Sequence, residues 1–360
     1  MGKDDDNVVQ IHAATLLLFT HLRYNAYMDL TAAIDTGAFF GKRALVIGGS
    51  GGIGAALSLL LAKSGAALTV HGGHSSAKFD ALLAQLATAS ERAMRSAAPC
   101  SESQLAPRSG DLQPAAQAGA VTSSSYKTPT PAPTPAPATV SAASRAAGER
   151  ASCGVDFSSS PCASSLCAPA VPVPLVQEIT ADGFTALPET PLARAAAESD
   201  ILCVCYGPFL QQPLAAMTAQ QWQAVTLLNY ALPGFFVSTA LPYMQARGWG
   251  RILLFGGTGT ESRREFATNA AYAGAKTAVG TLVQSTAAAY ARYGITCNAL
   301  LPGFTQTEYT GAQSATLAQK MPLGTLINAE AAARAAFFLL QNPDINGALL
   351  RFDRGWNPLF

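Results

Sequence analysis

Short apolar runs alternate with longer stretches rich in Ala and Leu. The short runs at 43–47, 67–70, 201–206, 251–255, 295–300 and 348–352 predict strands, and 174–179 is a further candidate. The longer stretches at 55–63, 220–246, 270–293 and 329–340 predict helices. Because strands that alternate with helices favour a parallel sheet, we expect an α/β, doubly wound (Rossmann) fold as a single domain over 41–360.

Two segments lack this pattern. Residues 97–174 are rich in Ala, Ser and Pro and include TPTPAPTPAPATV. Pro-rich repeats favour extended, solvated chain and build no core, so we interpret 97–174 as a disordered low-complexity insertion in the domain. A docking arm for a partner is the alternative. Residues 1–40 form an N-terminal extension, in which the apolar stretch 8–22 predicts a helix that packs on the body or on a partner.

A glycine-rich turn connects the first strand to the first helix. It reads Gly-Gly-Ser-Gly-Gly-Ile-Gly over 48–54. Such a turn lets main-chain N–H groups approach a pyrophosphate at the positive end of a helix. The strand before it and the helix after it favour dinucleotide binding over a tight turn without ligand. The predicted binding residues are Gly48, Ser50, Gly51, Gly52, Ile53 and Gly54.

The end of the second strand bears on which dinucleotide is bound. NAD-binding proteins tend to place Asp or Glu there, to accept from the ribose hydroxyls. Here the chain reads Val70-His71-Gly72-Gly73-His74 without an acid, and Lys78 follows. Imidazoles or Lys78 can meet a 2′-phosphate, so NADP is favoured and NAD stays open. The alternative is that both histidines are ordinary surface residues.

A possible acid–base pair lies on the helix at 270–293. Tyr272 and Lys276 are four residues apart, which places both side chains on one helix face. A lysine ammonium near a phenol lowers the phenol's pKa and suits it for proton transfer near neutrality.

Several motifs in this order resemble the classical short-chain dehydrogenase/reductase family. The turn at 48–54 resembles T-G-x-x-x-G-x-G, Trp222 and Asn229 resemble W-x₆-N, and Tyr272 and Lys276 match Y-x-x-x-K. NALLPGFTQT at 298–307 resembles N-x-x-x-P-G-x-x-x-T, and INGALLRFDRGW resembles the ending T-G-x-x-x-x-V-D-G-G. The likeness covers 41–95 and 175–360, with the 3-oxoacyl-carrier-protein reductase-like branch the most similar overall.

The resemblance implies further site residues. In the family, Lys also holds the nicotinamide ribose, and the carbonyl of the Asn that matches Asn229 binds a water that relays protons. Pro233 has no N–H to bond this carbonyl, which independently predicts an irregular helix there. A structural kink alone is the alternative. The resemblance also implies cofactor contacts by Gly207, Pro302, Gly303, Thr305 and Thr307.

Two departures from the family pattern concern the site. N-N-A-G is replaced by Val204-Cys205-Tyr206-Gly207, so only the glycine is kept. The catalytic Ser falls on Gly257 when aligned by the strand and on Gly259 when counted back from Tyr272. Thr258 lies between them and Thr260 follows. Either can donate a hydrogen bond to a substrate oxygen, and we favour Thr258.

Composition narrows the function further. The net charge of +1 gives no electrostatic argument for nucleic acid or an anionic membrane, and we predict neither as a partner. The 7 cysteines show no C-x-x-C pair and no metal spacing with histidine, so we expect free thiols, no metal and a cytoplasmic location. The acidic start MGKDDD does not suit a secretory signal.

We therefore expect an NADP(H)-dependent oxidoreductase that moves a hydride between nicotinamide and a carbonyl or secondary alcohol. Tyr272 transfers the proton, Lys276 tunes Tyr272, Asn229 supports the relay and Thr258 orients the oxygen. The substrate is a small carbonyl or acyl compound, and apolar helix faces predict a homotetramer. The alternative is a dinucleotide-binding sensor or scaffold of the same fold with weak or no turnover.

Overall fold

The computed structural model describes residues 37–97, 171–262, 265–266, 268–308 and 310–356. The predicted helix of the N-terminal extension and nearly all of the predicted insertion lie outside these residues. The described elements belong to one compact unit.

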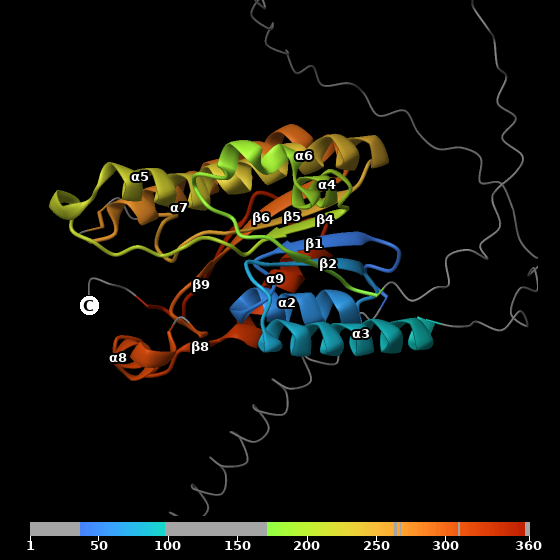
Figure 1. The fold of residues 1–360 in the computed structure, drawn as a ribbon, viewed down its shortest axis with the longest axis horizontal. Helices are drawn as coiled ribbons and strands as arrows, with labels where there is room; N and C mark the ends of the chain where they lie inside the picture. Colours follow the sequence, from blue (N-terminus) through green and yellow to red (C-terminus); the bar gives the residue numbers. More distant parts are fainter. Residues whose placement is uncertain (1–36, 98–170, 263–264, 267, 309, 357–360) are drawn as a thin grey trace, which may run out of the picture. The chain divides into compact units, whose positions relative to one another are not determined.

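A parallel sheet of 7 strands forms the centre of this unit (Figure 1). Its order is β3-β2-β1-β4-β5-β6-β9, and all neighbours run parallel, which confirms the predicted doubly wound sheet. The strands are β1 (Arg43–Ile47), β2 (Ala67–Gly72), β3 (Val173–Val176), β4 (Ile201–Val204), β5 (Gly250–Phe255), β6 (Ile295–Pro302) and β9 (Leu349–Phe352).

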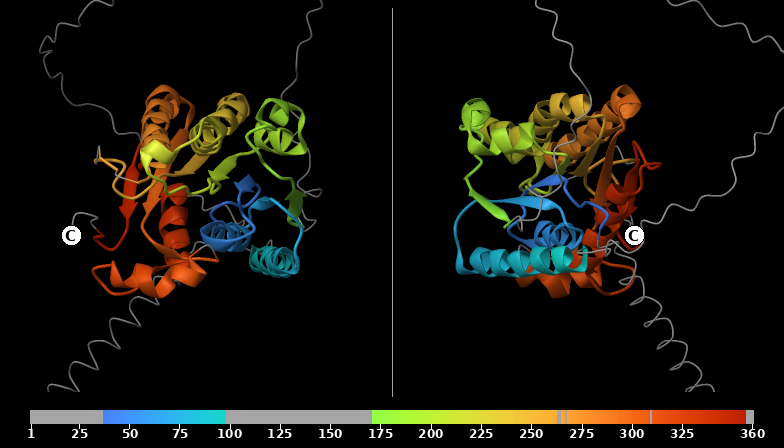
Figure 2. Two further views of the ribbon diagram at one scale, coloured as in Figure 1. Left: turned by 60° about the vertical axis from the view of Figure 1, so that its left-hand side comes forward. Right: turned by 90° about the vertical axis from the view of Figure 1, so that its right-hand side faces the viewer.

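Helices cover both faces of the sheet (Figures 1 and 2). One face carries α2 (Gly52–Lys63), α3 (Ala77–Ala97) and α9 (Ala329–Gln341). The other carries α4 (Pro191–Ala197), α5 (Ala219–Thr226), α6 (Leu232–Arg247) and α7 (Ala270–Tyr290). Successive strand residues point to opposite faces, so Val46 packs in one core while Leu45 and Ile47 pack in the other. Burial on both faces explains why the strands read as continuous apolar runs.

Several elements differ from the prediction, among them two helices and one boundary. The helices α3 and α4 were not predicted, because their sequences carry many small and polar residues. Yet α3 buries Phe79, Leu82 and Leu86 along one face. The strand β3 begins at Val173, just inside the segment interpreted as an insertion.

The predicted helix at 220–246 is a continuous run of three pieces. A π-helical turn, η5 (Leu227–Ala231), joins α5 to α6 directly before Pro233. Within the described residues, the run Ala219–Arg247 is also the one helix long and apolar enough to span a membrane. It is nevertheless packed on the sheet, since Leu232, Phe236 and Val237 are buried in the core.

Short elements complete the carboxyl edge of the sheet. They are β7 (Thr305–Gln306), α8 (Ser314–Gln319) and β8 (Ile327–Asn328), and β7 and β8 pair in parallel. Because β1 and β4 are neighbours while their following chain covers opposite faces, a crevice is expected at the carboxyl ends of these strands.

Candidate active site

The glycine-rich turn lies at this edge, between β1 and α2. Gly48 has a φ of 75°, which favours glycine, and a Cβ on it would lie 3.1 Å from the Tyr206 nitrogen. A Cβ on Gly54 would lie 2.2 Å from the Gly48 carbonyl oxygen. Only glycine therefore lets α2 start this close to the strand. The first N–H groups of a helix lack intrahelical partners, so the turn is compatible with a pyrophosphate, and the binding site stays a prediction.

The segment after β6 lies against the same turn. A Cβ on Gly52 would meet the Thr307 methyl at 3.0 Å, and one on Gly51 would meet a Glu308 carboxylate oxygen at 3.3 Å. Glu308 forms an ion pair with Lys78 of α3. Thr307 is thus beside the predicted pyrophosphate site, and a carboxylate that the sequence analysis did not single out joins it there.

Other residues predicted from this segment have structural contacts. Thr305 is buried, and its hydroxyl donates to the Gly303 carbonyl at 3.0 Å. Pro302 ends β6, and the Gly303 N–H donates to the Phe352 carbonyl at 3.0 Å. A Cβ on Gly303 would lie 2.8 Å from the Asp353 Cβ, so glycine is required for this packing.

His71 does not occupy the position predicted for it. The ring is buried, its Nδ1 accepts from the Gly48 N–H at 3.2 Å, and its Nε2 lies 2.7 Å from the Gln177 carbonyl oxygen. Both nitrogens are used when Nε2 carries the proton, and burial lowers the imidazole pKa. His71 therefore accepts a hydrogen bond from the glycine turn and is too buried to meet a 2′-phosphate. His74 and Lys78 are exposed beyond it.

Tyr272 and Lys276 lie one turn apart on α7, at the carboxyl ends of β4 and β5. The Lys276 ammonium donates to the Phe255 carbonyl at 2.9 Å and lies 5.7 Å from the centre of the Tyr272 ring. A Cβ on Gly207 would lie 3.0 Å from this ammonium nitrogen and 2.4 Å from the Asn229 Oδ1. The four predicted residues Gly207, Asn229, Tyr272 and Lys276 are therefore brought together.

Asn229 is held in place by the π-helical turn. The Leu232 N–H bonds the Leu227 carbonyl across five residues, so the helix is irregular directly before Pro233, as predicted. The Asn229 amide donates to the Pro208 carbonyl at 3.0 Å and to the Val225 carbonyl at 3.1 Å. Its Oδ1 is buried and has no partner among the described residues. The predicted relay water on its main-chain carbonyl stays a prediction.

Burial dominates the electrostatics of this group. It lowers the pKa of Lys276 to about 8 and raises that of Tyr272 to about 12. The expected lowering of the phenol pKa by Lys276 is thus absent from this structure, because the ammonium bonds the Phe255 carbonyl instead of the phenol. Cys205, on the neighbouring strand end, has a thiol pKa raised to about 12 by burial.

The structure favours Gly257 as the position of the family's serine. A Cβ there would lie 3.6 Å from the Lys276 Cβ and 3.3 Å from the Thr260 methyl, which is ordinary or slightly tight contact. Gly259 has a φ of 78°, a conformation that side chains rarely adopt. The loop before α7 is therefore two residues longer than the family pattern.

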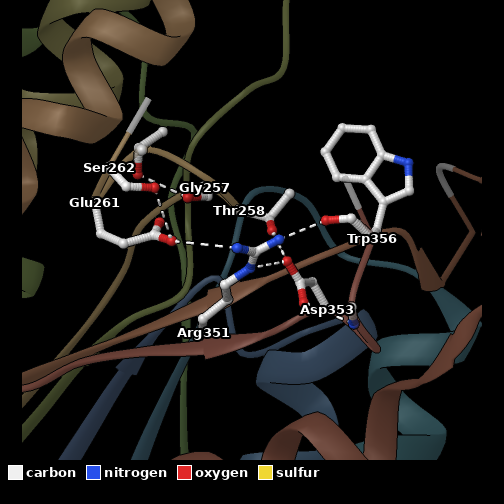
Figure 3. Close-up of polar contacts among 9 residues, drawn as sticks. Gly257, Thr258, Glu261, Ser262, Arg351, Asp353 and Trp356 are labelled. Atoms are coloured by element: carbon white, nitrogen blue, oxygen red, sulfur yellow. Dashed lines mark hydrogen bonds and ion pairs between the residues drawn. The ribbon is translucent and has the colours of Figure 1, made fainter. Parts of the chain in front are cut away.

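The threonines proposed to replace the serine both have partners in the protein. Thr260 is buried, and its hydroxyl donates to the Gly257 carbonyl at 2.7 Å. The Thr258 hydroxyl donates to the Asp353 carboxylate at the end of β9 (Figure 3). To donate to a substrate oxygen, Thr258 has to leave Asp353.

Sequence reasoning missed the ionic network around Asp353. Arg351 bonds the same carboxylate oxygen, donates to the Trp356 carbonyl and lies 3.8 Å from a Glu261 carboxylate oxygen (Figure 3). The network joins the loop before α7 to the C-terminal segment. Thr258 and Asp353 are 95 positions apart, so no local pattern signals their contact. Among the described residues, no cluster of three or more His, Cys, Asp or Glu could hold a metal ion.

Parts of the chain are similar to known reductases and dehydrogenases. Residues 191–357 match a family model described as enoyl-(acyl carrier protein) reductase. The chain is 30% identical over 154 residues to cis-4-hydroxycyclohexanecarboxylate dehydrogenase of Sinomonas cyclohexanicum, 40% of this chain and 59% of that protein. It is also 30% identical over 168 residues to 2-dehydro-3-deoxy-D-gluconate 5-dehydrogenase of Pseudoalteromonas atlantica. This match covers 44% of this chain and 64% of that protein. The chain thus spans between 59% and 64% of the length of these relatives.

Solved structures share the fold. A short-chain dehydrogenase/reductase from Serratia marcescens superimposes with a TM-score of 0.59 at 22% identity, covering 88% of this chain and 98% of that one. The sheet order defines a doubly wound α/β protein, and the glycine turn and the Tyr–Lys pair are compatible with a bound dinucleotide. The chain is thus similar to this family model over residues 191–357, and it shares its fold with a short-chain dehydrogenase/reductase. Its placement in the 3-oxoacyl-carrier-protein reductase-like branch stays a prediction.

Proposed function

We propose that the protein is an NADP(H)-dependent oxidoreductase that interconverts a carbonyl compound and a secondary alcohol. The observation that carries this proposal is the grouping of Tyr272, Lys276 and Asn229 beside Gly207, next to a glycine turn that admits a pyrophosphate. A bound dinucleotide supplies or accepts the hydride. The names of the two relatives, both dehydrogenases of hydroxylated or keto carboxylic acids, support an alcohol or ketone as the substrate group.

The residues have separate roles in this proposal. The Tyr272 phenol gives its proton to the substrate oxygen in reduction and takes it back in oxidation. A phenol with a pKa of about 12 stays protonated at neutral pH, which suits it as the acid. Lys276 gives up the Phe255 carbonyl in this proposal and brings its charge to a cofactor ribose or to the phenolate. We keep Thr258 as the proposed donor to the substrate oxygen.

The preference for NADP rests on the end of β2. The segment from Gly72 to Lys78 contains no acidic residue. The Glu308 carboxylate, which follows β7 in the sequence, forms an ion pair with Lys78. Lys78 and His74 are the exposed basic side chains there, whereas His71 is excluded by its burial. We expect NADPH to bind more tightly than NADH, and Lys78→Ala to reduce this difference. Dissociation constants from the fluorescence of the reduced nicotinamide measure both.

Absorbance at 340 nm with a panel of ketones and acyl thioesters tests the activity. Oxidation of NADPH that depends on the ketone and is lost in Tyr272→Phe supports the proposal. Tight NADPH binding without turnover of any compound would instead favour a sensor or scaffold. The altered Val204-Cys205-Tyr206 segment and the absent serine are the observations that speak for this second function.

A further inference from the structure

Phe209 is a large apolar side chain that stands exposed beside the proposed catalytic phenol. It remains 59% exposed although the strand end that it follows is buried. Its ring lies edge-on to the Tyr272 ring, with 5.0 Å between the ring centres and 79° between the planes. Such edge-to-face contact is favourable, and it leaves most of the phenyl surface uncovered.

Hydrogen bonds fix the loop on both sides of Phe209. On one side, the Pro208 carbonyl accepts from the buried Asn229 amide at 3.0 Å. On the other, the Gln211 amide donates to the Thr268 hydroxyl at 2.9 Å, just before α7 begins. The ring is therefore held against Tyr272 by the same residues that hold the site, and it is not a side chain on a free loop.

We propose that Phe209 forms an apolar wall of the substrate site and selects substrates whose reacting carbon lies in, or is attached to, a hydrophobic ring. The inference rests on the proposed function, since it takes Tyr272 as the group that meets the reacting oxygen. Any substituent on the carbon that bears this oxygen has to pass close to Tyr272. One flat ring on the side of Phe209 covers the exposed phenyl surface better than a flexible chain, and it loses less conformational freedom.

The charges placed around this wall also favour an apolar group. Lys276 lies beside Tyr272, and it is buried with its ammonium on a main-chain carbonyl. Within the residues that the structure describes, this ammonium is therefore not left to bind an anion on the side of Phe209. A neutral ring is therefore the simplest fit to this side of the site.

The test compares ring ketones with open-chain ketones in wild type and Phe209→Ala. With NADPH, we expect Phe209→Ala to lower kcat/KM about tenfold for cyclohexanone and acetophenone, mostly through KM, because a buried phenyl contact is lost. Straight-chain 2-hexanone should change about twofold or less. Phe209→Leu should keep part of the ring preference. Leu214→Ala is the matched control, since Leu214 lies five residues further along the chain, in a short 3-10 helix, and is similarly exposed at 57%.

A second measurement does not depend on turnover. Acetophenone binding to the NADP⁺ complex, measured by saturation-transfer NMR, should be strong in wild type and Leu214→Ala and weak in Phe209→Ala. If wild type reduces ketones but Phe209→Ala affects ring and open-chain ketones equally, the inference is wrong and the proposed function stands. If no ketone is reduced, the proposed function fails, and acetophenone binding in wild type and Phe209→Ala then shows by itself whether Phe209 binds a ring. A loss of self-association in Phe209→Ala with unchanged ring binding would show that a second copy covers the ring, and would also overturn the inference.

Discussion

Lys276 carries an amino group at a position that is 4% exposed. Burial disfavours the charged form, so its pKa falls from 10.5 to about 8, and a single main-chain carbonyl at 2.9 Å partners the ammonium. A group held this way is protonated at neutral pH at a cost to stability. Because the ammonium is buried, its positive charge is weakly screened and attracts neighbouring oxygen atoms strongly.

The first prediction concerns stability against pH in Lys276→Met. The folded-state pKa lies below the unfolded value, so between about pH 8 and 10.5 the unfolded chain binds more protons, and stability from this residue rises with pH. We expect the unfolding free energy of wild type minus that of Lys276→Met to increase by about 1–3 kcal/mol between about pH 7.5 and pH 10. Urea denaturation across this range measures it.

Tyr272→Phe is the matched control for this series. The phenol stays protonated in the folded chain up to a pKa of about 12, so its difference from wild type should be flat up to about pH 9.5. A flat or falling difference for Lys276→Met would contradict the burial of a charged lysine.

The second prediction concerns the donor to the substrate oxygen. Thr258→Val keeps the shape of the side chain but removes the hydroxyl, and we expect kcat to fall by about 10²–10³ with unchanged NADPH affinity. Because Asp353 also loses a donor, the melting temperature should fall as well. Thr260→Val, whose hydroxyl bonds the Gly257 carbonyl, should leave kcat nearly unchanged.

Gly257→Ser provides the opposite test. The site accepts a Cβ with small adjustments, and the new hydroxyl would lie beside the Lys276 stem. If Gly257→Ser raises kcat tenfold or more while Thr258→Val has no effect, no threonine performs the serine's role.

Single residues also show where sequence reasoning stops. The Tyr–Lys spacing and Pro233 act through local geometry, so the proximity of Tyr272 and Lys276 and the irregular helix were predictable. His71 was misjudged because its exposure depends on Gln177, a partner 106 positions away. The Arg351–Asp353 network was missed for the same reason, since its partners come from the loop before α7 and from the C-terminal segment, with Thr258 and Asp353 95 positions apart.

At the scale of elements, the turn before α2 combines tight packing with an open helix end. Gly48 and Gly54 exclude side chains, whereas Gly51 has an extended backbone and only the tip of Glu308 near it. The strands around it were predicted closely because buried parallel strands are continuously apolar. In contrast, α3 was missed because its buried face includes small or polar residues such as Ala89 and Ser90, and tertiary packing decides its fold.

The third prediction separates charge from volume at Gly51. In Gly51→Asp a carboxylate would join Glu308 at the site expected to hold the pyrophosphate, so NADPH affinity should fall by about tenfold or more. Gly51→Ala, which adds only a methyl group, should bind NADPH within about threefold of wild type. Fluorescence titration with NADPH measures both, and equal losses in the two variants would show that volume, not charge, matters.

At the scale of the whole molecule, apolar side chains remain exposed on the helices that cover one face of the sheet. Trp222 on α5 is 42% exposed and Tyr230 on the π-helical turn is 37% exposed. Because α5 lies beside α7, these residues add to the apolar surface from which a homotetramer was predicted.

The fourth prediction follows from this surface. Multi-angle light scattering at micromolar concentration should give a tetramer for wild type, and Trp222→Glu should shift it to smaller species. Phe338→Glu, on the opposite helical layer, is the control because Phe338 is also exposed, at 53%. If wild type is a monomer, the predicted tetramer is wrong.

The fifth prediction concerns the chain between α3 and β3. Replacement of 98–170 by a short Gly/Ser linker should leave folding and NADPH binding intact, because loop closure costs little more for long loops than for short ones. Circular dichroism and NADPH titration measure this, and an insoluble product would show that these residues carry structure.

The pairing of β1 with β4 has a consequence for biosynthesis. Arg43 bonds Asp200 across 157 positions, and the centre of the sheet depends on such distant partners. At roughly 5–20 residues per second, the ribosome makes β4 about 10–30 s after β1, while β1 and β2 wait with apolar faces uncovered. Sheets of this connectivity also close slowly. The nascent chain is therefore an expected client of chaperones that shield apolar segments, and slower synthesis at low temperature should raise the yield of soluble protein.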